Sequence, residues 1–202
     1  AYRDQASVLQ VGPESAGADP GPVCYDQGGS RLTVTDANLL TGRLVASSVF
    51  GDTIRLNKEK TAHQADQFSQ EFGIAREELA ESILAVANAK MERAIRVISV
   101  EQGYDPGTAT LIAFGGAGPL HGCAIAGALG IGQVLVPVHA GVFSAFGLLW
   151  ADVVRDRTRT VIRRTPDIDW EELEDLLLEI QAEVEQDILA QGIEEEAVRF
   201  EW

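Results

Sequence analysis

The chain has 202 residues, of which 46% are hydrophobic, and its formal net charge is −15. No apolar run approaches the roughly 18 residues of a membrane span, and the charge excludes the basic patch that nucleic acids and anionic membranes require. We expect a soluble cytoplasmic protein, because no secretion signal is visible and two distant cysteines suit a reducing compartment. The charge is uneven, since residues 165–202 hold 14 acidic residues against one basic residue, and residues 1–164 hold 17 against 15.

The first predicted strand covers residues 8–11, and a loop rich in proline and glycine follows over residues 12–22. Proline removes a hydrogen-bond donor and glycine removes backbone preference, so no regular element is expected there. Long loops of this kind tend to be functional, although a surface linker is the alternative. Residues 33–40 are expected to turn from a short strand into a helix, with Thr35 or Asp36 at the N-cap.

Apolar residues at intervals of three and four predict a strong helix over residues 76–102, after a weaker helix over residues 59–72. The apolar stripe of the strong helix consists of Leu79, Ile83, Val86, Ala87, Met91, Ala94, Ile95 and Ile98. Another amphipathic helix is predicted over residues 169–191, and its acidic face is expected to be solvated. Residues 153–163 are expected to form an exposed antiparallel strand.

A strand, a helix and a second strand are predicted in the middle of the chain, around Thr110-Leu-Ile-Ala-Phe-Gly-Gly-Ala-Gly-Pro-Leu-His121. The strands cover residues 110–114 and 133–137, and the helix covers residues 119–129. A connection of this length predicts a parallel pair, and therefore an α/β fold. Ligands of such sheets bind beyond the carboxyl ends of the strands. The glycine turn and the segment that begins at His139 are therefore expected to be neighbours on one rim.

The glycine turn of residues 115–118 is the first candidate binding site. A strand that ends at a helix start brings unpaired N–H groups and the positive end of a helix dipole to one place. Glycine also lets a ligand approach the main chain closely. The alternative is a tight turn that only packs. The spacing of Gly116, Gly118 and Gly122 is not that of the dinucleotide fingerprint, and no P-loop sequence occurs.

Polar residues near the two strand ends are candidates for hydrogen bonding or acid–base chemistry. His121 follows the glycine turn, and His139 follows the second strand. A structurally satisfied histidine is the alternative for each. Asp36 is a further candidate, with helix capping as the alternative. No metal-ligand spacing and no nucleophile elbow occur, so Cys123 and Ser144 have no support as nucleophiles.

Four sequence blocks occur in order along the chain: Val11–Tyr25, Thr33–Asn38, Phe114–His121 and Gly141–Leu149. Together they resemble the hydantoinase/oxoprolinase family, and more narrowly its hydantoinase A type subunit and the equivalent half of 5-oxoprolinase. The resemblance implies an actin-like ATPase fold with ribonuclease-H-like halves. Residues 1–164 would form a partial domain of that fold. Residues 165–202 would hold an acidic amphipathic helix and the start of a following segment.

The resemblance implies ATP-dependent opening of a cyclic amide such as hydantoin or 5-oxoproline. In that reaction ATP activates the amide oxygen as a phosphorylated intermediate, which water then hydrolyses. The glycine turn would be the adenosine-binding motif, formed by Gly115, Gly116, Ala117 and Gly118. The substrate rim would be formed by Glu14, Ser15, Asp19, His139 and Ser144. The catalytic residue is not identified, and the candidates are His121 and Asp36.

The resemblance also implies that part of the catalytic centre lies outside the chain. The phosphate-gripping motifs and the carboxylates that bind Mg²⁺ are expected upstream of Ala1, so no metal ligand is predicted here. The chain is thus expected to be a fragment of an ATP-dependent cyclic-amide hydrolase, inactive alone, which acts with a hydantoinase B type subunit. A fragment of an ATP-dependent carboxylase of the same family and a non-catalytic assembly module are the alternatives.

Overall fold

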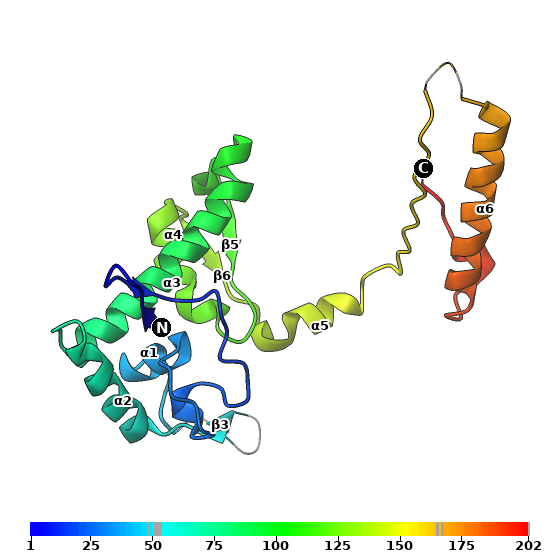
Figure 1. Ribbon diagram of the computed structural model, residues 1–202. Helices are drawn as coiled ribbons and strands as arrows, with labels where there is room; N and C mark the ends of the chain where they lie inside the picture. Colours follow the sequence, from blue (N-terminus) through cyan, green and yellow to red (C-terminus); the bar gives the residue numbers. More distant parts are fainter. Residues whose placement is uncertain (48, 51–53, 165, 167, 202) are drawn as a thin grey trace. The chain divides into compact units, whose positions relative to one another are not determined.

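The computed structural model describes residues 1–47, 49–50, 54–164, 166 and 168–201. The chain divides into two compact units, Ala1–Ser144 and Ala145–Trp202 (Figure 1). Helices and short strand pairs, one of them parallel, confirm the predicted α/β class. The expected family-domain boundary between residues 164 and 165 stays a prediction, and residue 165 lies outside the described residues.

The first unit begins with an antiparallel pair of short strands, β1 (Tyr2–Arg3) and β2 (Leu9–Gln10). The strand predicted over residues 8–11 is therefore confirmed in a shorter form. All residues of the loop 12–22 are described, and they form no helix or strand, as their composition predicts. A 3-10 turn, η1 (Val23–Tyr25), ends the loop with Val23 and Cys24 fully buried.

The next helix, α1 (Val34–Leu40), has its N-cap two or three residues before the predicted position. Thr33 is the N-cap residue, and its Oγ1 accepts a hydrogen bond from the Asp36 backbone N–H at 3.3 Å. The Asp36 carboxylate in turn accepts one from the Thr33 N–H at 2.8 Å. The prediction of Thr35 or Asp36 as the N-cap was therefore wrong, because the T-x-x-D sequence forms a capping box with its acid at the third helical position.

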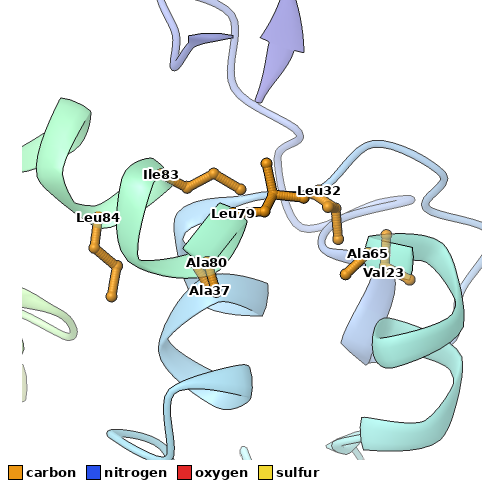
Figure 2. Close-up of a cluster of buried hydrophobic side chains, with 8 residues drawn as sticks. All are labelled: Val23, Leu32, Ala37, Ala65, Leu79, Ala80, Ile83 and Leu84. Carbon is orange, nitrogen blue, oxygen red and sulfur yellow. The ribbon is translucent and has the colours of Figure 1, made fainter. Parts of the chain in front are cut away.

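Two longer helices, α2 (Lys58–Gln70) and α3 (Arg76–Ile98), complete the core of the first unit. A short antiparallel pair, β3 (Val49–Phe50) and β4 (Ile54–Arg55), precedes them. Figure 2 shows the buried side chains of this core, which are Val23, Leu32, Ala37, Ala65, Leu79, Ala80, Ile83 and Leu84. The small side chains of Ala37 in α1 and Ala80 in α3 both belong to this core, and the two helices pack on each other.

The second half of α3 packs on another helix, α4 (Gly118–Leu129). This second core contains Ile125, Ala126, Leu129 and Ile131, with Met91, Ile95, Leu111 and Val134 packed against it. Most of the predicted stripe of α3 is thus buried or half-buried. Ala94 and Ile98 are exceptions, because both are exposed, Ile98 to 73%. The helix also ends at Ile98, before the predicted residue 102, and a 3-10 turn follows it.

The predicted strand–helix–strand unit is confirmed. Strands β5 (Thr110–Ile112) and β6 (Gln133–Leu135) are parallel, with Leu111 opposite Val134, and α4 connects them. Gly122 brings α4 close to both strands, because a Cβ there would lie 3.0 Å from the Ala113 Cβ and 3.2 Å from Val134 Cγ1. The carboxyl ends of both strands therefore meet at one edge, where the glycine turn begins.

The second unit contains the helix α6 (Trp170–Leu189), which Asp169 caps. Residues 153–163 form no strand, so that prediction was wrong. The alternating arginines of this segment instead pair with α6, through the pairs Arg157–Asp187, Arg159–Glu179, Arg159–Glu183 and Arg163–Glu172. The acidic face of α6 is therefore not simply solvated, since four of its carboxylates have arginine partners.

Shorter elements complete the described chain. They are η2 (Val100–Gln102), η3 (Pro106–Thr108), η4 (Ala140–Val142), α5 (Phe143–Leu148) and η6 (Glu195–Ala197). Among the described residues, no helix is both long enough and apolar enough to cross a membrane.

Candidate functional site

The glycine bend, residues Gly115–Gly118, follows β5 and leads into α4. Gly115 has a φ of +84°, which only glycine adopts at little cost. Its N–H donates a hydrogen bond to the Ala140 carbonyl at 2.7 Å. The rings of Phe114 and Phe143 also lie in contact, with centroids 5.3 Å apart. The prediction that the two segments after the strands are neighbours is therefore confirmed.

The glycine bend is open rather than filled by side chains. A Cβ built on Gly115 or on Gly116 meets no atom within 4 Å. The N-cap residue of α4 is Ala117, which has no side chain to cap the helix. Within the described residues, no acceptor takes the N–H groups of Gly116, Ala117 and Gly118. The bend thus presents free donors at the positive end of a helix, a combination that favours an anionic ligand.

The segment of residues 139–144 forms the other side of this edge. His139 precedes η4 as its N-cap residue and is exposed, and Ser144 is also exposed. Both predicted rim residues are therefore accessible close to the glycine bend. Their contact with a substrate stays a prediction.

His121 lies in the first turn of α4, but its side chain is only 3% exposed. Its Nδ1 lies 2.7 Å from the Oδ1 of Asn88, which belongs to α3. Burial lowers the pKa of His121, and the positive charge of Arg43 lowers it further. The imidazole is therefore neutral near pH 7. A catalytic role for His121 stays a prediction.

Asp36 is fully buried and holds several backbone segments together. Its carboxylate accepts hydrogen bonds from the N–H groups of Val23 at 3.2 Å, Cys24 at 2.8 Å and Thr33 at 2.8 Å. The Thr33 hydroxyl donates a fourth, at 2.8 Å. These contacts support a structural role for the carboxylate, because every one of them fixes η1 or the start of α1. Its predicted catalytic role is untested.

The buried Asp36 also acts on the neighbouring thiol of Cys24. Burial raises the pKa of Cys24, and the negative charge of Asp36 raises it further. Cys123, the other free cysteine, is exposed on α4. Thiol reagents attack the thiolate, so exposure and pKa together determine the rate.

We therefore expect one fast and one slow thiol in the native protein. Cys123 should react with iodoacetamide at pH 8 at least about 100-fold faster than Cys24, because Cys24 is both buried and protonated. Mass spectrometry of the alkylated peptides measures both rates. In Cys123→Ser the fast reaction should disappear, and denaturant should expose Cys24. Equal rates in the native protein would contradict this account of Cys24.

The proline- and glycine-rich loop carries the other predicted rim residues. Glu14 forms an exposed ion pair with Arg31 at 2.9 Å, and Ser15 accepts a hydrogen bond from the Gly17 N–H at 3.1 Å. Asp19 is exposed. Among the described residues, no hydrogen bond or ion pair joins the loop to the glycine bend. No direct bond in the described chain therefore links these three residues to the bend, and their place in the rim stays a prediction.

The sequence pattern did not indicate two residues of α3 that contact the predicted site segments. Asn88 bonds His121, and the Lys90 ammonium donates a hydrogen bond to the Val11 carbonyl at 2.6 Å, where the loop begins. Their partners lie 33 and 79 residues away in the sequence. Neither residue belongs to a local motif, so no sequence signal was available for them.

Other features of the described chain lie away from these residues. No three side chains of His, Cys, Asp or Glu in the described ranges are placed to share a metal ion. A hollow of about 670 Å³ lies in the second unit, between Val161 and the first half of α6. None of the predicted site residues lines that hollow.

Comparisons with known proteins identify relatives. The family model of hydantoinase/oxoprolinase matches residues 1–157. Caprolactamase subunit alpha of Pseudomonas jessenii is 39% identical over 184 residues, which are 90% of this chain and 26% of that protein. The crystal structure of ATP-dependent caprolactamase from that organism superposes with a TM-score of 0.70, at 39% identity, over 91% of this chain and 27% of that one.

Two further relatives widen the comparison. The 5-oxoprolinase PfmaA of Pestalotiopsis fici is 38% identical over 209 residues, which are 98% of this chain and 16% of that protein. A nucleotide-free structure of acetone carboxylase, an enzyme of ATP-dependent acetone carboxylation, is also similar. It superposes with a TM-score of 0.65 and 26% identity, over 70% of this chain and 20% of that one. The chain thus spans about a quarter or less of the length of these relatives.

Proposed function

Because the chain belongs to the hydantoinase/oxoprolinase family, we propose that it holds the adenosine side of the nucleotide site in an ATP-dependent cyclic-amide hydrolase. The relatives named for caprolactamase and 5-oxoprolinase act on cyclic amides, and the caprolactamase is ATP-dependent. The observation that carries the proposal is the open glycine bend. Its free N–H groups and missing side chains are what a nucleotide needs for close approach.

The surroundings of the bend support a nucleotide at this place. Gly115 and Gly116 leave space that any Cβ would reduce, and the free N–H groups of residues 116–118 provide donors. In the proposed reaction the bound nucleotide supplies the phosphoryl group that activates the ring amide. This chain's own residues bind and orient the nucleotide, whereas the Mg²⁺ ligands and the phosphate-gripping motifs are proposed to lie outside it.

The remaining parts of the proposal concern surroundings of the site. We assign Glu14, Ser15, Asp19, His139 and Ser144 to the substrate rim. Within the actin-like ATPase fold that we propose, the β5–α4–β6 unit would be the part that carries the adenosine motif. The name caprolactamase subunit alpha implies a further subunit in that relative. We propose a hydantoinase B type partner here too, in the cytoplasm.

A pair of glycine substitutions tests the proposed nucleotide role. In the full-length protein with its partner subunit, Gly116→Leu should raise the KM for ATP at least about tenfold, because the side chain occupies the space of the ligand. Gly127→Leu, on α4, is the matched control. Both glycines lack a positive φ, and a Cβ on either meets no atom within 4 Å. The control should leave ATP hydrolysis unchanged.

The readout is ATP hydrolysis coupled to ring opening of caprolactam, hydantoin and 5-oxoproline. A wild-type protein that opens none of these rings and binds no ATP would contradict the proposal and favour the non-catalytic module. Equal KM values for ATP in Gly116→Leu and Gly127→Leu would show that the glycine bend is not part of the nucleotide site.

A carboxylase is the second candidate function, and the structural likeness to acetone carboxylase favours it. The nucleotide role of the bend would be the same. Incorporation of labelled bicarbonate into a ketone, without opening of any cyclic amide, would select this alternative.

A further inference from the structure

His121 links the first turn of α4 to the middle of α3. The remaining packing between these helices lies further along α4, at Ile125, Ala126 and Leu129, against Met91 and Ile95 of α3. The first turn has no side-chain cap that would hold it. On one side the bend is fixed by the Gly115 N–H at the Ala140 carbonyl. On the other side the 2.7 Å contact between His121 Nδ1 and Asn88 Oδ1 holds the first turn to α3. The neighbouring Gly122 packs closely on Ala113 and Val134 but, among the described residues, forms no hydrogen bond to α3.

The partner atom determines the form of the imidazole. An amide oxygen only accepts hydrogen bonds, so Nδ1 carries the hydrogen and Nε2 is the bare nitrogen. The charged group that acts on the ring is Arg43, which itself lies 3.6 Å from Glu81 of α3. Among the described residues, no carboxylate is hydrogen-bonded to His121. A neutral, nearly enclosed ring of this kind is suited to holding a position rather than to carrying a proton to a substrate.

We infer that the hydrogen bond between His121 and Asn88 positions the glycine bend, so that both are positioning residues of the nucleotide site. The inference rests on the proposed nucleotide role of the bend. His121 acts through the first turn of α4, which carries Gly118 and the free N–H groups, and not on the reacting atoms. Asn88 is part of the same device, although it is far from the bend in sequence.

Two substitutions of His121 separate positioning from catalysis. His121→Asn keeps a nitrogen close to the place of Nδ1, and His121→Gln keeps one close to the place of Nε2. For a positioning role, His121→Gln and Asn88→Leu should each raise the KM for ATP about fivefold or more, the effect of one buried hydrogen bond, with a smaller change in kcat. His121→Asn should recover most of that loss. His63→Asn, on the exposed face of α2, is the matched control.

The opposite pattern overturns the inference. A loss of kcat of about 100-fold or more in both His121 variants, with the KM for ATP unchanged, would make His121 a catalytic residue. Wild-type kinetics in Asn88→Leu would show that the contact positions nothing. If the wild-type protein itself binds no ATP, the proposed function is wrong, and this inference is then wrong as well.

A measurement without nucleotide tests the hydrogen bond between His121 and Asn88 directly, and it does not depend on turnover. Asn88→Asp places a carboxylate at the Nδ1–H, which favours the imidazolium and should raise the pKa of His121 by at least one unit in an NMR titration. His63 and His139 serve as internal references. An unchanged pKa of His121 would mean that residue 88 does not bond the ring, and the inference would be wrong whatever the kinetics show.

Discussion

Asp36→Asn should lower the free energy of unfolding by about 3 kcal/mol or more. The carboxylate accepts four hydrogen bonds in a fully buried position, from Val23, Cys24 and from both donors of Thr33. An amide group offers one oxygen and turns an NH₂ toward the remaining donors. Those donors are then left buried without an acceptor, which costs more than the loss of an exposed hydrogen bond.

Denaturant unfolding of the intact protein measures this loss, with Asp26→Asn as the matched control. Asp26 is an exposed carboxylate that pairs with Lys60 and Asn57, so its replacement should cost only a small fraction as much. Similar losses in the two variants would contradict the structural role of Asp36. A stable Asp36→Asn protein without turnover would instead support the catalytic role offered by the sequence.

Gly29→Ala is expected to be similarly damaging, at about 3 kcal/mol or more, for a steric reason. A Cβ on Gly29 would lie 2.3 Å from the Gly21 carbonyl oxygen and 2.9 Å from that of Pro22. Both are backbone atoms, so no side-chain rotation relieves the clash. The contact holds residue 29 against the end of the proline- and glycine-rich loop, and its loss should also disorder the proposed rim residues in that loop.

Gly132→Ala is the control for this substitution. A Cβ there meets no atom within 4 Å, and the residue has no positive φ. Thermal unfolding should show little change for Gly132→Ala and a large decrease for Gly29→Ala. If both variants unfold at the same temperature, the close approach of the two backbone segments is not a feature of the folded protein.

The sequence predicted the elements whose signals are local. Periodicity placed α3 and α6, and the glycine bend between two apolar runs placed the parallel β5–β6 pair. The N-cap of α1 was misplaced because Asp36 fits two positions of a helix start, and only the Thr33 contacts distinguish them. The alternation in residues 153–163 predicted an exposed antiparallel strand, and that was wrong. Its arginines pair with the acidic face of α6 instead, which the local pattern does not reveal.

In the candidate site, too, the features that depend on local sequence signals were predictable. Strand order alone placed the glycine bend beside the segment from His139, since parallel strands end at the same edge. The pairing of His121 with Asn88 was not predictable, because the two residues are 33 positions apart in the sequence. Their contact depends on how α3 and α4 pack. The loop residues Glu14, Ser15 and Asp19 came from the family resemblance, and their place in the site stays a prediction.

Hydrogen exchange of the full-length protein with a non-hydrolysable ATP analogue tests the nucleotide role of the bend most directly. The free N–H groups of residues 116–118 should exchange rapidly without the analogue and at least about tenfold more slowly with it. Residues 139–142, which hold the other side of the bend, should be slowed as well. Tight binding of the analogue with unchanged exchange in both segments would place the nucleotide elsewhere.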